Sequence, residues 1–118
     1  MPMTTTSRRQ RYPLLVDDPH AGSWLRIQAN LGRAPNTIEA YGRSLQDFLA
    51  FSAVNDVDPA LAGREHIAAY VRHLLSRARA NRENVRVLDS GGGLANATVQ
   101  QRLTAVRLYY DYLIEEGL

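Results

Sequence analysis

The residues best suited to binding chemistry lie near the end of the chain, on a helical segment at residues 96–113 that reads NATVQQRLTAVRLYYDYL. Its apolar residues recur every three or four positions, which collects them on one face of a helix. Amides, hydroxyls and positive charge occupy the rest of the helix surface, at Gln100, Gln101, Arg102, Thr104 and Arg107. Glutamine and arginine hydrogen-bond to base edges, and threonine hydroxyls bind phosphates. This combination favours a polyanionic partner.

Two arginines of this segment stand on opposite sides of its apolar stripe. Arg102 and Arg107 are separated by roughly 140° around a helix, so one flat surface cannot meet both equally, whereas a grooved partner can. In an earlier helical segment, Arg43 and Ser44 lie opposite the apolar stripe, and Thr37 lies near the N-terminal edge, where first-turn amides can receive an anion. A plain solvated face is the alternative interpretation of both surfaces.

Catalytic and metal-binding patterns find no support in the sequence. The chain has no cysteine, and its histidines His20, His66 and His73 lack the acidic partners that would complete a metal site. The glycines at 91–93 are not followed by the Lys-Ser/Thr of a phosphate-binding loop. We therefore expect no catalytic residue, no cofactor and no metal ion in this chain.

Four helices must position these side chains. Asp18 can cap a first helix that has Pro19 at its first position and stops at Gly32. A capping box of Asn36 and Glu39 is expected to open a second helix of four to five turns. No strand pattern competes apart from a brief NVRVL, so the sequence predicts an all-α fold.

The remaining two helices are separated by a long polar stretch. Apolar spacing predicts the third helix over residues 64–79, and Asn96 is expected to cap the fourth. Residues 80–95 are too polar and too rich in glycine to continue a helix, so we predict a long loop there, which is uncommon inside a compact domain. The expected architecture is a compact four-helix bundle.

Length and composition indicate a single domain at residues 18–118, preceded by a flexible basic arm at residues 1–17. No apolar run approaches the length of a membrane-spanning helix, and the absence of cysteine fits a reducing compartment. We expect a cytoplasmic protein that does not contact a membrane.

Charge is unevenly distributed along the chain. Residues 61–110 hold eight arginines against three acidic residues, a local net charge of +5, whereas residues 34–60 come to −3. Every basic residue other than histidine is arginine, the better bidentate partner for phosphate and guanine, although genomic base composition alone can explain this usage.

Three stretches together resemble the N-terminal SAM-like, or core-binding, domain of the tyrosine recombinases and phage integrases. They are APNTIEAYGRSLQDFLAF at 34–51, REHIAAYVRHLL at 64–75 and NATVQQRLTAVRLYYDYLIEEGL at 96–118. The first carries the family's spacing at Thr37, Tyr41, Leu45 and Phe48, and the last carries it at Thr98, Arg102, Leu103, Ala105, Val106, Arg107, Tyr109 and Tyr110. The resemblance covers about residues 19–118.

The resemblance implies a SAM-like fold that grips one half-site of a recombination sequence, with its second and fourth helices against the major groove of double-stranded DNA. The implied DNA-binding residues, taken together with the polar face of the fourth helix, are Thr37, Arg43, Ser44, Thr98, Gln101, Arg102, Thr104 and Arg107. It also implies a catalytic domain, absent from this chain and expected after residue 118, and contacts with other protomers on DNA.

Two alternatives stay open at the level of sequence. A helical protein-interaction module could use the same arginine-bearing surface to meet an acidic protein, and a free-standing DNA-binding regulator would need no recombinase activity. An enzyme in its own right has the least support, because no constellation of acid, base and nucleophile is visible.

Overall fold

The computed structural model describes residues 11–84 and 91–117, and the side chains of residues 11–77 and 97–117. Its helices are α2 (Pro13–Asp17), α3 (Pro19–Asn30), α4 (Pro35–Val54), α5 (Arg64–Asn84) and α6 (Gly91–Glu115), with a short 3-10 helix, η1 (Pro59–Leu61), before α5. No strand occurs in the described ranges. The predicted all-α fold is confirmed, and the four predicted helices correspond to α3, α4, α5 and α6.

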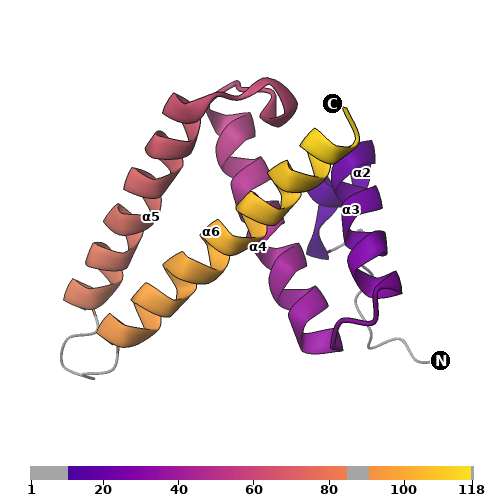
Figure 1. Cartoon of the computed structure of the whole chain (residues 1–118). Coiled ribbons are helices and arrows are strands. Elements are labelled where there is room, and N and C mark those ends of the chain that lie inside the picture. Colours follow the sequence, from indigo (N-terminus) through magenta and orange to yellow (C-terminus); the bar gives the residue numbers. More distant parts are fainter. Residues whose placement is uncertain (1–10, 85–90, 118) are drawn as a thin grey trace.

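Helix α6 is central to the arrangement. It crosses α4 diagonally, with α5 on one side of the crossing and α2 and α3 on the other (Figure 1). Helix α6 contacts α3, α4 and α5, whereas α2 contacts α3 and α4. Helix α4 is therefore in contact with α2, α3 and α6.

Helix α3 begins as its sequence predicts. The carboxylate of Asp18 accepts hydrogen bonds from the backbone N–H groups of His20 (2.9 Å) and Ala21 (3.0 Å), and Pro19 occupies the first position of the helix. After the helix, Gly32 has a φ of +84°, a conformation that is unstrained only for glycine.

Helix α4 begins differently from the prediction. Ala34 is its N-cap, Pro35 is at its first position, and no side chain caps it, so the predicted capping box of Asn36 and Glu39 is wrong. Glu39 instead accepts hydrogen bonds from Arg11 (2.7 and 2.8 Å) and from the hydroxyl of Tyr12. A charged partner and a tyrosine from a distant segment outcompete the local cap.

Residues 11–17 are packed against the domain, so the predicted flexible arm is wrong over this part. Leu15 is 1% exposed, and its backbone N–H donates to the side-chain oxygen of Gln46 (3.1 Å). The ring of Tyr12 lies against Gly42, where a Cβ would meet it at 3.0 Å. The gain from burying Tyr12 and Leu15 outweighs the chain entropy that an arm would keep. Residues 1–10 lie outside the described residues.

The predicted loop at residues 80–95 is shorter than expected. Helix α5 continues to Asn84 and α6 starts at Gly91, so Asn96 lies inside α6 and does not cap it. Arginine, alanine and leucine in these stretches have good helix propensity, and a helix can continue past the point where it stops burying an apolar face. Residues 85–90 lie outside the described residues.

Aromatic side chains from all the long helices form the core. The ring of Trp24 on α3 stacks on Tyr41 of α4 at 5.7 Å between centroids and meets Tyr109 of α6 edge-on at 5.9 Å. Phe48 of α4 meets Tyr70 of α5 edge-on at 5.0 Å. These contacts join α4 to α3 and α5, and α3 to α6. Among the described residues, no helix is long and apolar enough to cross a membrane.

Candidate nucleic-acid interface

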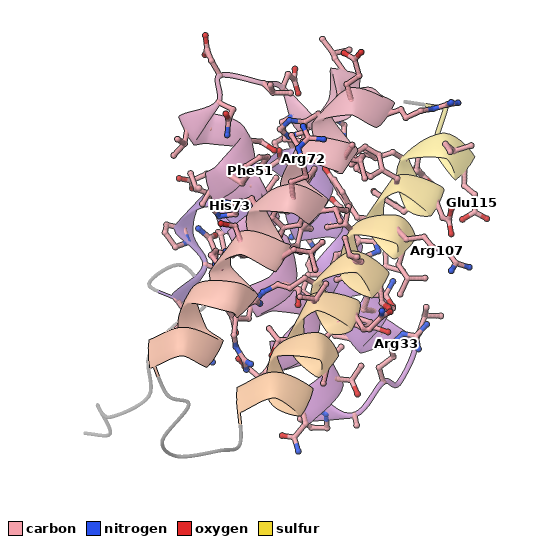
Figure 2. All side chains as sticks on the ribbon, turned by 90° about the vertical axis from the view of Figure 1, so that its left-hand side faces the viewer. Arg33, Phe51, Arg72, His73, Arg107 and Glu115 are labelled. Carbon is pink, nitrogen blue, oxygen red and sulfur yellow. The ribbon has the colours of Figure 1, made fainter. Side chains whose placement is uncertain are left out.

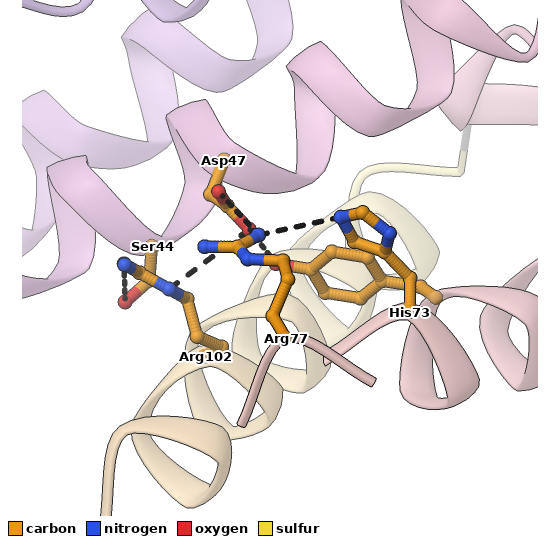
Figure 3. Close-up of polar contacts among 6 residues, drawn as sticks. Ser44, Asp47, His73, Arg77 and Arg102 are labelled. Carbon is orange, nitrogen blue, oxygen red and sulfur yellow. Dashed lines mark hydrogen bonds and ion pairs between the residues drawn. The ribbon is translucent and has the colours of Figure 1, made fainter. Parts of the chain in front are cut away.

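Two of the predicted contact residues meet each other inside the protein, where α6 crosses α4. The guanidinium of Arg102 reaches Ser44 Oγ at 3.5 Å and lies 3.9 Å from a carboxylate oxygen of Asp47 (Figure 3). Ser44 is fully buried, and the Arg102 side chain is 13% exposed. Ser44 has no surface to offer a partner, so we correct its assignment: it packs α4 against α6. Arg102 joins the same helices.

Asp47 is the centre of this polar cluster, which we call the Asp47 cluster: Ser44, Asp47, Tyr70, Arg77 and Arg102. Its carboxylate accepts hydrogen bonds from the Tyr70 hydroxyl (2.6 Å) and from Arg77 Nη1 (3.0 and 3.1 Å). Burial, followed by the bond to Asp47, raises the pKa of Tyr70 far above its usual value, so its hydroxyl stays protonated and donates. One carboxylate of α4 therefore joins α5 and α6.

Sequence reasoning missed the Asp47 cluster. One signal was available, since Tyr70 and Arg77 are seven residues apart and so share a face of α5. That spacing does not identify residue 47 as their partner, because the pairing depends on how α4 and α5 pack.

The outer face of α6 is the surface that matches the predicted chemistry. Gln101, Thr104 and Arg107 are exposed there, and Arg107 points away from the bundle (Figure 2). No acidic residue occurs between residues 90 and 110 of the sequence. This face therefore presents amide, hydroxyl and guanidinium groups without a competing carboxylate of its own.

The other predicted residues lie on the N-terminal halves of α4 and α6, which diverge from the crossing (Figure 1). Arg43 is exposed, whereas Thr37 and Thr98 are half-buried. Arg43 follows Gly42, against which the Tyr12 ring packs, so it lies beside the segment that precedes α2. The structure thus divides the eight predicted residues into four exposed, two half-buried, and the internal pair Ser44 and Arg102.

Arg33, in the loop before α4, was not predicted and shares a side of the molecule with Arg107 (Figure 2). Its Nε donates to the side-chain oxygen of Gln28 at 2.5 Å, and its guanidinium lies over the Tyr41 ring, 5.8 Å from the centroid. The sequence shows only an arginine beside a helix start, with no sign of these two contacts.

His66 takes a structural position. His66 Nε2 lies 2.8 Å from the hydroxyl of buried Ser52, and its ring packs against Phe48 and Phe51. Burial lowers the pKa of His66. In the part of the chain that the structure describes, no three histidine or acidic side chains gather as a metal site would require.

Comparisons with known proteins agree with this architecture. Residues 24–117 match the family described as phage integrase, N-terminal SAM-like domain. The chain is also similar to the tyrosine recombinase XerD of Rhizobium meliloti (strain 1021), with 27% identity over 92 residues. That alignment covers 78% of this chain and 25% of the relative, so the chain spans about a quarter of that relative's length. No solved structure matches significantly.

Proposed function

This chain belongs to the phage integrase family of N-terminal SAM-like domains, and from this premise we propose that it is the DNA-binding domain of a site-specific tyrosine recombinase. The family predicted from the three sequence stretches is confirmed. In the proposed role, the domain grips double-stranded DNA at a recombination half-site and leaves strand cleavage to a catalytic domain outside these 118 residues.

The observation that most supports DNA binding by this chain is the exposed face of α6, which presents Gln101, Thr104 and Arg107. Guanidinium and amide groups read base edges in a major groove wide enough to admit a helix, and hydroxyl groups hold phosphates. Arg43 on α4 would supply a further phosphate contact. The Asp47 cluster would act indirectly, because it fixes the angle between α4 and α6.

The tyrosines whose pKa values are shifted fit a domain without a nucleophile of its own. The Tyr110 hydroxyl donates to the backbone carbonyl of Pro59, and burial raises its pKa to about 12. Burial also raises the pKa values of Tyr70 and Tyr109 well above the usual range. A phenol held in this way is a poor nucleophile, so these three tyrosines pack the core and are not candidates for covalent chemistry.

A second contact, with another protomer on the same DNA, has one observation in its favour. The groove between α3 and α6 is lined by apolar residues together with Gln28, Asp111 and Glu115, and its apolar residues Ile27, Leu31 and Ile114 are 39%, 65% and 72% exposed. Exposed apolar side chains that line one groove are typical of a protein contact. Sedimentation of the chain with DNA that carries two half-sites, compared with an Ile114→Ser variant, tests this contact.

The DNA-binding proposal is tested by fluorescence anisotropy of a labelled duplex of about 30 base pairs, titrated with this chain at several salt concentrations. We expect binding that weakens steeply with salt, and a loss of affinity for Arg107→Gln. Arg26→Gln is the matched control, since it removes the same charge from an exposed position on α3 and leaves α6 unchanged. No binding of a mixed-sequence pool at low salt would contradict the proposal and favour a protein-interaction module.

A further inference from the structure

Contacts within the domain orient the side chain of Arg33 and leave its two terminal amino groups available to a partner. Its Nε donates to Gln28, which is itself only 8% exposed, and its guanidinium carbon lies over the Tyr41 ring, 5.8 Å from the centroid. Both contacts fix the direction of the side chain, yet neither uses the two terminal amino groups. No carboxylate of the described residues lies within ion-pair distance of Arg33.

We propose that Arg33 binds a backbone phosphate of the DNA, as a fixed guanidinium that acts beside Arg107. This inference rests on the proposed function, because it names a further contact to the same duplex. A guanidinium that is already oriented loses less side-chain entropy on binding than a free arginine does. Its two terminal amino groups match the geometry of a phosphate, which accepts two parallel hydrogen bonds.

The positions of Arg33 and Arg107 agree with a shared partner. Both side chains extend on the same side of the molecule (Figure 2). The groove between α3 and α6, lined in part by Gln28 and Leu108, also carries the carboxylates of Asp111 and Glu115, so a phosphate backbone would follow the outer face of α6 and not enter the groove. A polyanion laid along the outer face of α6 would meet both charges.

The test is anisotropy of the same labelled duplex with the whole chain, comparing Arg33→Gln with the control Arg26→Gln. Arg26 is also an exposed arginine, and its guanidinium reaches only the hydroxyl of Ser23 among the described contacts. We expect Arg33→Gln to weaken binding by roughly fivefold to tenfold on every sequence tested and to reduce the slope of log affinity against log salt by about one. Thermal unfolding of each variant checks that the fold is intact.

A second variant tests whether Gln28 orients Arg33, independently of the charge of Arg33. We expect Gln28→Ala to weaken binding by roughly two- to threefold while the salt slope stays unchanged, because the charge of Arg33 remains but its orientation is lost. In the Arg33→Gln background, the same Gln28→Ala change should have no effect on binding. A destabilised fold alone would weaken both backgrounds equally.

The possible results distinguish the phosphate contact of Arg33 from DNA binding by the chain as a whole. If the unmodified chain binds DNA but Arg33→Gln behaves like Arg26→Gln, the phosphate contact is overturned and the proposed function stands. If Arg33→Gln weakens binding to one sequence only, Arg33 reads a base and the phosphate assignment is equally overturned. If the unmodified chain binds no duplex at low salt, the proposed function fails, and the inference fails with it.

Discussion

Arg102 and Arg107 are five residues apart on α6 and have the same side chain, but the fold gives them opposite surroundings. Arg102 lies between α4 and α6 with 13% of its side chain exposed, close to Asp47 and Ser44. Arg107 is exposed and points away from the bundle. The residue type therefore does not determine the role. What separates them is the approach of α4, which brings a carboxylate to one arginine and leaves the other facing solvent.

Burying the guanidinium of Arg102 between α4 and α6 costs free energy. Moving a guanidinium out of water is unfavourable unless a carboxylate and hydrogen-bond acceptors compensate it. Arg102 Nε has no hydrogen-bond partner within the described part of the chain, and its ion pair with Asp47 is long, at 3.9 Å. Asp47 must therefore offset Arg102 while it also binds Tyr70 and Arg77. The comparison predicts that stability depends on the inner side of α6 and DNA affinity on its outer side.

The largest expected effect is on Asp47. Replacing Asp47 by alanine leaves Tyr70 and Arg77 without their shared acceptor and Arg102 without its ion-pair partner, so we expect the free energy of unfolding to fall by about 2–4 kcal/mol. Urea denaturation measures this loss. Asp111→Ala is the matched control, since Asp111 is an exposed carboxylate on α6. Equal losses for the two variants would mean that Asp47 does not hold the helices together.

The next effect separates the two arginines directly. We expect Arg102→Leu to change the free energy of unfolding by about 1–2 kcal/mol, with its sign set by how well leucine fills the site, and to leave the salt slope of DNA binding unchanged. We expect Arg107→Leu to leave the free energy of unfolding within about 0.5 kcal/mol of the unmodified chain. It should lower the salt slope of DNA binding by about one. A fall in the salt slope for Arg102→Leu would mean that Arg102 contacts the DNA and that the two arginines do not differ in role.

These two arginines also mark the limit of what the sequence could predict. The start of α3 is encoded locally by Asp18 and Pro19 and was predicted correctly, because a cap needs only its own neighbours. The role of Arg102 depends on residue 47, which is 55 positions away in the chain. Helical periodicity placed Arg102 beside the apolar stripe, yet it could not show that α4 covers that side.

The error at the start of α4 has the same physical origin. Asn36 and Glu39 form an acceptable local cap in the sequence, but Arg11 and Tyr12 engage Glu39 in the fold. The buried aromatic on α6 shows the same limit. Tyr110 fits the predicted stripe, whereas the structure buries Tyr109 more deeply, because Trp24 packs against it. Local signals identify helices, and only the packing decides which face is inside.

A smaller effect tests the other side of α4, where Tyr12 rather than an arginine covers the helix. Alanine favours a helix over glycine by about 1 kcal/mol, but a Cβ at position 42 would meet the Tyr12 ring at 3.0 Å. We expect Gly42→Ala to destabilise the unmodified chain by about 1 kcal/mol and to stabilise the Tyr12→Ala variant by a similar amount. Urea denaturation of the four proteins in this cycle measures the difference. The same sign in both backgrounds would show that Tyr12 does not pack on Gly42.

The smallest expected effect concerns pH and belongs to the inner side of the molecule. Burial lowers the pKa of His66 below its ordinary value of 6.5, so the unfolded chain binds a proton at this residue more readily than the folded chain does. Stability from this source is therefore complete above about pH 7.5 and falls as the pH drops through the unfolded pKa toward the folded one.

His66→Gln keeps a hydrogen-bonding group for Ser52 without the titration, so its stability should vary less between about pH 7.5 and 5.5. The control, His20→Gln, should retain the dependence of the unmodified chain. Urea denaturation at each pH distinguishes them, and an equally steep dependence in His66→Gln would show that another group titrates. DNA affinity measured over the same range provides the remaining contrast, because residues 100–107 of α6 include no histidine and no acidic residue.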